Sequence, residues 1–202
     1  MTRRRAATGT VGVVLPADWH VVDLSTDAGR HADVAALVDR QVPRRDDLAT
    51  VRRRLRREVE DSSRRAAQSG GRFCAYMLTT VGPVRLPAVL TAYRTPGSLA
   101  ADEDLDALAT TLAQRLGPHG TVDAGDGPFG AVLRTVTVRS APADGTGADL
   151  LVCDYWSDPA DGDGLLLLSF STPLGALRDA MLDLFDAIAG STRRAPAARV
   201  DA

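Results

Sequence analysis

The sequence predicts an α+β fold: one domain with a mostly antiparallel sheet of about six or seven strands and helices packed on its faces. Segments with strand periodicity follow one another in runs joined by short turns, and they do not alternate strictly with helices. Four other segments carry apolar residues at helical spacing. No repeat or interior linker interrupts the pattern, so we expect a single domain over residues 11–190, flanked by a flexible basic tail (1–10) and a flexible C-terminal tail (191–202).

The strands are predicted from short runs of β-branched, apolar and aromatic residues. Seven segments qualify: 11–15, 19–24, 73–81, 84–94, 131–139, 150–156 and 165–170. Pro16 lies between the first two segments and favours a turn, so we expect these two strands to form a hairpin. Pro87 lies inside the fourth segment and indicates an edge strand or a bulge, because proline has no N–H to donate across a sheet.

The helices are predicted from apolar stripes and from residues that begin or end helices. The first begins near Ser25, Thr26 and Asp27, all of them good N-cap residues, and ends before Pro43. Further helices are expected over residues 46–68 and 102–116. The last is expected to begin at Thr172 as cap with Pro173 in its first turn, and to end at Gly190.

The helix predicted over residues 46–68 has the strongest charge pattern in the chain. Nine arginines against five acidic residues leave a net charge of +4 between residues 44 and 65. At 100° per residue, four of these arginines point mostly away from the apolar stripe that would face the core: Arg52, Arg53, Arg56 and Arg57. A solvated helix face explains this pattern, and a surface for an anionic partner is the functional interpretation, since the planar guanidinium suits carboxylates and phosphates.

The composition excludes several kinds of chemistry. All 24 basic residues are arginine, so the chain has no lysine for a Schiff base, a phosphate-binding loop or a protein-kinase site. Cys74 and Cys153 are too few for a disulfide framework or a multi-thiolate zinc site. We expect two buried free thiols, with a bridge between neighbouring strands left open. The sequence predicts no cofactor and no metal ligands.

Gly125, Gly127 and Gly130 match the letters of a dinucleotide-binding motif. That motif needs a helix after it, whose N-terminus would meet the pyrophosphate. Here Pro128 interrupts the motif and a strand pattern follows, so the sequence favours a glycine-rich turn.

Aspartates, histidines and one serine are candidates for metal ligands or a nucleophile, but the sequence favours a structural role for each of them. Asp158, Asp161 and Asp163 share a loop, but their spacing does not match a calcium-binding loop. The histidines lack metal-site spacing, and Ser171 lacks the glycines of a nucleophile turn. The three histidines are His20, His31 and His119.

Two stretches carry a resemblance to known proteins. The first is Leu15-Pro16-Ala17-Asp18-Trp19; the second runs from Tyr155-Trp156 through the apolar strand at 165–170 to Leu184-Phe185-Asp186-Ala187-Ile188. The pattern resembles uncharacterised proteins of high-GC (actinobacterial-type) bacteria, some of them associated with type VII secretion, and it is similar to the Mog1/PsbP-like α/β/α sandwich. The resemblance implies a non-catalytic accessory domain that binds proteins, and it carries over no catalytic residue.

The sequence therefore favours a non-catalytic protein-interaction or accessory module with a protein partner of unknown identity. One alternative is an enzyme whose site is assembled from distant Asp, Arg and His residues. A second is a binder of an anionic partner through the helix at 46–68. Nucleic acid is disfavoured, because only nine aromatic residues exist and most lie in apolar patterns. The apolar runs are too short to span a membrane, a homodimer stays open, and the expected location is the cytoplasm.

Overall fold

The computed structural model describes residues 4–81, 84–99, 105–140 and 149–194. These residues form ten strands and four α-helices, with short 3₁₀ turns between some of them. The strands are β1 (Arg4–Thr8), β2 (Val11–Leu15), β3 (Trp19–Asp23), β4 (Gly71–Val81), β5 (Val84–Thr95), β6 (Gly120–Gly127), β7 (Gly130–Ser140), β8 (Asp149–Ser157), β9 (Leu165–Thr172) and β10 (Arg193–Arg194). The helices are α1 (Asp27–Gln41), α2 (Ala49–Gln68), α3 (Leu105–Leu116) and α4 (Arg178–Gly190).

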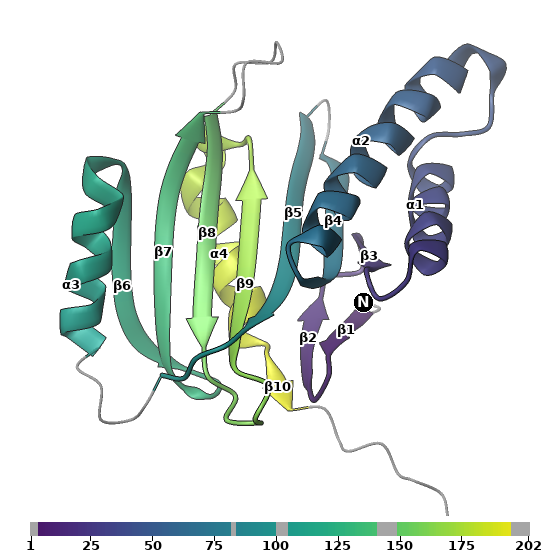
Figure 1. Ribbon diagram of the computed structural model, residues 1–202. Helices are drawn as coiled ribbons and strands as arrows, with labels where there is room; N and C mark the ends of the chain where they lie inside the picture. The colour runs from purple at the N-terminus through teal and green to yellow at the C-terminus, as the bar shows by residue number, and fades with distance from the viewer. Residues whose placement is uncertain (1–3, 82–83, 100–104, 141–148, 195–202) are drawn as a thin grey trace, which may run out of the picture.

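Seven strands form one antiparallel sheet in the order β3-β4-β5-β9-β8-β7-β6, and three form a small sheet in the order β1-β2-β10 (Figure 1). The predicted α+β class and the antiparallel sheet are confirmed. None of the four helices within the described residues is both long and apolar enough to cross a membrane.

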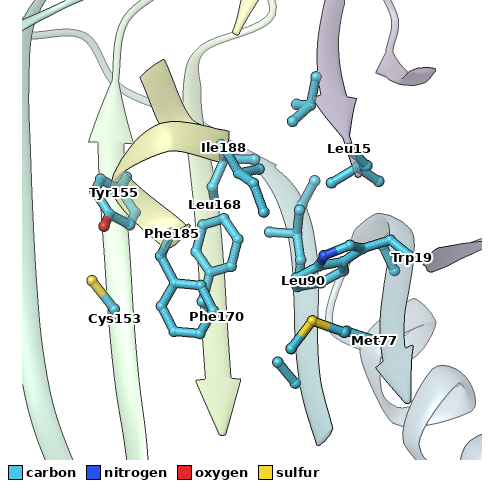
Figure 2. Packing of buried hydrophobic residues seen from close by; sticks show 14 of the residues in the cluster. Leu15, Trp19, Met77, Leu90, Cys153, Tyr155, Leu168, Phe170, Phe185 and Ile188 are labelled. Carbon is cyan, nitrogen blue, oxygen red and sulfur yellow. The ribbon is translucent and has the colours of Figure 1, made fainter. Parts of the chain in front are cut away.

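One face of the large sheet packs against α4 and the small sheet. Phe170 on β9 is fully buried; its ring stacks on Phe185 of α4 with centroids 4.6 Å apart, and Trp19 meets it edge-on at 6.4 Å. Figure 2 shows these rings with Leu90 and Ile188 around them. Large side chains in close-packed contact make this cluster the main source of hydrophobic stabilisation.

The opposite face is covered at one end by α1 and α2. Val34 and Leu37 of α1 and Val59 of α2 pack on Val22 of β3 and Cys74 of β4. Of the three candidate N-cap residues, Thr26 caps α1, because its hydroxyl accepts a hydrogen bond from the amide of Gly29 at 3.1 Å. The two helices therefore cover β3 and β4, while α3 lies along β6 at the far edge (Figure 1).

The predicted hairpin of the first two strands is wrong. Strand β2 pairs with β1 and β10, whereas β3 begins the large sheet beside β4. Both strands contribute to one core, since Leu15 and Trp19 are fully buried in it, so the turn at Pro16 leads from one sheet into the other. Residues 4–8 and 193–194, expected in flexible tails, pair with β2 in the small sheet; the outermost residues of both tails lie outside the described residues.

The edge strand or bulge predicted from Pro87 and the helix cap predicted at Thr172 also need correction. Strand β5 lies inside the sheet, between β4 and β9, and is not an edge strand. Its pairing with β9 begins only at Val89, so Pro87 has a strand partner on the β4 side alone, and its missing N–H costs no hydrogen bond to β9. Thr172 does not cap α4, which begins six residues later at Arg178. Its hydroxyl accepts from the amide of Leu174 and donates to the carbonyl of Pro87, which ties the end of β9 to β5.

Candidate functional site

The helix α2 divides into two halves that differ in burial. Its only buried residues, Val59, Ser63 and Ala66, all lie in the second half (Val59–Gln68), which we call the docked half. The first half (Ala49–Glu58), which we call the projecting half, contains none. In Figure 1 the beginning of α2 lies away from the sheet and its end lies over β4. The apolar stripe predicted to face the core thus does so only in part, because Val51 is 44% exposed.

The projecting half is held against α1 by one carboxylate. Asp39, near the end of α1, accepts hydrogen bonds from Arg44 in the connecting loop and from Arg52 on α2. These hydrogen bonds lower the pKa of Asp39 to about 2. Arg52 also donates to the carbonyl of Val42, where α1 ends. The result is a fixed elbow, formed by the end of α1, the loop and the projecting half of α2.

One side of this elbow forms an open pocket of about 580 Å³. Two arginines of the loop and three of α2 line it together with one acid: Arg44, Arg45, Arg52, Arg53, Arg56 and Asp46. The structure therefore brings together three of the four arginines that the sequence singled out. Arg57 is exposed on the same helix but does not line the pocket.

Three acids outside the lining neutralise part of this charge. Asp39 pairs with Arg44 and Arg52, Asp47 pairs with Arg45 at 2.9 Å, and Glu60 pairs with Arg56 at 3.1 Å. Arg53 forms no ion pair with any described residue, and its guanidinium reaches only the hydroxyl of Thr50, at 3.5 Å. The pocket thus keeps a net positive charge, and Arg53 is its most available cation.

The other side of the projecting half borders an apolar groove of about 590 Å³. The groove lies between the projecting half, the end of α1 and the β4–β5 pair, and is lined by Gln41, Val42, Val51, Arg54, Leu55, Glu58, Leu78 and Pro87. Arg54 and Glu58 form an ion pair at its rim. The projecting half therefore presents cationic groups on one side and apolar side chains on the other.

The sequence signal for this site was incomplete. Charge counting identified the α2 arginines, and the two loop arginines belonged to the same run. The apolar stripe was expected to face the core along the whole helix; Leu55 does pack partly buried against the core, but Val51 is exposed, because helical spacing cannot tell a stripe that meets the sheet from one that extends past it. Asp39 gave no separate signal, since its role depends on how α1 and α2 fold back on each other.

The glycine motif lies at the β6–β7 hairpin, as its interpretation as a turn predicted. Gly127 pairs with Gly130 at the end of the ladder, and Gly125 lies within β6. Gly130 has a positive φ of 94°, which suits glycine at this tight connection. A strand follows the motif instead of a helix, so no helix N-terminus is available here for a phosphate.

The aspartates of the 158–164 loop have structural partners. Asp161 accepts hydrogen bonds from Thr10 and from Arg94, whose side chain is only 2% exposed. Asp158 accepts from the backbone amides of Leu99 and Ala160. These bonds fix the loop against β5 and the β1–β2 turn. Within the described part of the chain, no group of three or more acids, histidines or cysteines is arranged to hold a metal ion.

The cysteines and histidines do not converge. Cys74 and Cys153 are both buried and free, on opposite faces of the sheet, so the bridge left open by the sequence does not form. Burial raises the pKa of both thiols. His20 is buried with its Nε2 2.9 Å from the carbonyl oxygen of Asp33, and the exposed His31 lies 3.5 Å from Glu60. The side chain of His119 lies outside the described positions.

Ser171 lies within β9 and not in a strand-to-helix turn, so it does not have the setting of a hydrolase nucleophile.

A second polar group, unmarked in the sequence, joins α4 to the sheet. Arg134 of β7 donates both to Asp186 of α4 and to Asp123 of β6, and the Tyr155 hydroxyl donates to Asp186 at 2.6 Å. These ion pairs raise the pKa of Arg134. Each of these four side chains has a partner within the group, which indicates a structural connection.

The comparisons with known proteins add no relative. No family model, no curated protein and no solved structure matches the chain.

Proposed function

We propose that this protein is an interaction module that binds an acidic, amphipathic segment of a partner protein at the elbow between α1 and α2. Apolar side chains of the partner would enter the groove beside Val51 and Leu55. Its carboxylates would meet the arginines along the projecting half. The secretion-linked role and the cytoplasmic location stay predictions.

The observation that carries this proposal is the projecting half itself. Among its ten residues, Ala49–Glu58, none is fully buried, and Leu55 alone packs, partly buried, against the protein's own core. Isolated helices of this length are marginal in water, so the Arg52–Asp39 contact and Leu55 supply the support that holds this half-helix in place. Its exposed Val51 and unpaired Arg53 become useful when a second surface covers them.

A protein segment fits this surface better than a nucleic acid. The elbow offers no aromatic side chain for base stacking, since residues 27–68 contain no Phe, Tyr or Trp. Acids also alternate with the arginines, and Glu58 stands at the rim of the groove. A partner with carboxylates at spaced positions and an apolar stripe complements this mixture, whereas a continuous phosphate backbone does not.

The test uses a fluorescein-labelled synthetic peptide of about 18 residues, with leucines at helical spacing and glutamates elsewhere. Its anisotropy is measured with the full-length protein from about 50 to about 300 mM salt. We expect binding that weakens steeply as salt rises. Replacing Arg53 and Arg57 together by alanine is expected to weaken binding at low salt about tenfold, because each exposed charge contributes up to about 1 kcal/mol.

The matched control replaces Arg64 and Arg65, two exposed arginines of the docked half, by alanine. This variant loses the same net charge and is expected to bind like the wild type. Failure of the peptide to bind, affinity unchanged across the salt range, or equal weakening in both double variants would contradict the proposal.

A further inference from the structure

The middle of the large sheet has a second surface that the elbow does not involve. On the face opposite α4, α2 lies over β4 and α3 lies along β6, and within the described residues no helix lies over β9 and β8 between them (Figure 1). Side chains of β5, β9 and β8 that point to this face form what we call the central strip.

The strand register places six side chains of the central strip in two adjacent rows. In one row Leu167 of β9 lies directly between Trp156 and Tyr93. In the next row Ser169 of β9 lies between Asp154 and Thr91. Directly opposed side chains are about 5 Å apart, and the next residue on the same face of a strand lies about 7 Å away. Two aromatic rings, a carboxylate and two hydroxyls thus share a small area.

The carboxylate of Asp154 forms no ion pair with any residue that the structure describes. Ser169 donates a hydrogen bond to it at 2.5 Å, and this is its side-chain partner in the described residues. Arg139, farther along β7 on the same face, acts on it electrostatically without forming an ion pair. Burial raises the pKa of Asp154 above its usual range. By contrast, Asp161 and Asp186 each have an arginine in contact.

A partly buried carboxylate without an ion pair costs stability, and a neutral residue at this position would avoid that cost. On the other face, which α4 covers, Cys153 and Phe170, the neighbours of Asp154 and Ser169 in the chain, are both buried and apolar. The folding of the sheet therefore does not by itself account for a charge at this position.

We propose that the central strip is a binding site for a small organic cation carrying a guanidinium or primary ammonium group. Asp154 supplies the counter-charge, held in place by the hydroxyl of Ser169. Trp156 and Tyr93 flank the site with aromatic rings, whose faces attract cations within about 6 Å. Leu167 between them provides apolar contact for the carbon chain of the ligand. Because Asp154 carries the charge of the strip, an anionic ligand is disfavoured.

The chain allows a direct measurement of this binding. It contains two tryptophans, and Trp19 is fully buried in the core on the other face. The protein therefore gives two indole N–H signals in an NMR spectrum, and a Trp19→Phe variant assigns them. The probe is butylguanidinium, and the control probe is butylurea, which has a similar shape and no charge.

We expect butylguanidinium to shift the Trp156 signal saturably and to leave the Trp19 signal in place, while butylurea shifts neither. The Asp154→Asn variant should weaken the binding of butylguanidinium at least about tenfold, the equivalent of about 1.4 kcal/mol. The control variant Asp149→Asn, on the same strand with its side chain on the other face, should bind like the wild type. The melting temperature of Asp154→Asn should not fall, because the variant removes a desolvated charge; this checks that it is folded.

If the Asp154→Asn variant is not folded, the Ser169→Ala variant replaces it and should weaken binding in the same direction, because it frees the carboxylate from its fixed position. The absence of a saturable shift, an equal response to butylurea, or unchanged affinity in the Asp154 or Ser169 variant would overturn the proposal.

Discussion

Helices α4 and α2 are both amphipathic, yet they use their apolar residues differently. Helix α4 buries four residues in 13: Met181, Leu182, Phe185 and Ile188. Helix α2 is longer, with 20 residues, and buries three of them, all in its docked half. Helix α4 therefore covers the sheet with buried residues along most of its length, whereas α2 covers the sheet only with its docked half.

The difference teaches that an amphipathic pattern by itself does not say what the apolar face meets. Along α4 it meets Phe170 and the small sheet. Along the projecting half of α2 it meets a half-open groove, beside guanidinium groups that the protein neutralises only in part. We therefore expect changes in α4 to alter stability and changes in the projecting half to alter binding.

The largest effect is expected at the centre of the α4 contact. Phe185 is fully buried and stacks on Phe170, so the Phe185→Ala variant leaves a cavity between helix and sheet. We expect a loss of about 3–5 kcal/mol in the free energy of unfolding, measured by denaturant titration. A loss below about 1 kcal/mol would show that α4 is not part of the main core.

The next effect compares the same substitution in the two halves of α2. Val59 is 5% exposed and Val51 is 44% exposed. The Val59→Ala variant should lose about 1.5–2 kcal/mol of stability, because it removes buried carbon from the core. The Val51→Ala variant should lose less than about 0.5 kcal/mol. Similar losses in both variants would mean that the two halves are equally supported.

For binding of the acidic peptide, we expect Val51→Ala to have a larger effect than Val59→Ala, the reverse of their effects on stability. The Val51→Ala variant is expected to weaken binding severalfold, because its side chain lines the groove. The Val59→Ala variant is expected to bind like the wild type when both are folded. If Val51→Ala binds the peptide unchanged, the groove is not the site of apolar contact.

A smaller effect concerns the carboxylate that fixes the elbow. The folded-state pKa of Asp39, about 2, lies below its ordinary value of 3.8, so the contribution of this group to stability is present above about pH 4 and is lost as the pH falls toward 2. An NMR titration of the Asp39 carboxyl should therefore have its midpoint near 2. In the Arg44→Gln/Arg52→Gln variant the midpoint should return toward 3.8; a midpoint near 3.8 in the wild type would mean that the elbow is not held in this way.

Much of the fold could be predicted because local signals agreed with tertiary structure. Seven strands and four helices were expected near their observed positions, and Trp19 and His20 face opposite sides of β3 as alternation requires. The short β1 and β10 were missed, since their pairing with β2 depends on residues far apart in the chain. Strand β6 was missed because it is rich in glycine and aspartate, which are typical of turns.

The candidate sites were less predictable for a related reason. Arginine density at residues 44–65 was visible, but the pocket depends on the angle at which α2 leaves α1. The central strip gave no signal, because Tyr93, Asp154 and Trp156 come together only through the register of β5, β9 and β8. The local residue pattern of one sequence does not show which residues of distant strands lie opposite each other.

Hydrogen exchange along α2 tests the division of this helix most directly. In the free protein, amides of Ala49–Glu58 should exchange much faster than those of Val59–Gln68, since few buried contacts hold the projecting half. Adding the acidic peptide should slow exchange in Ala49–Glu58 and leave Val59–Gln68 unchanged. Uniform protection of the whole helix in the free protein, or a peptide effect spread evenly along it, would contradict the assignment of the projecting half as a binding surface.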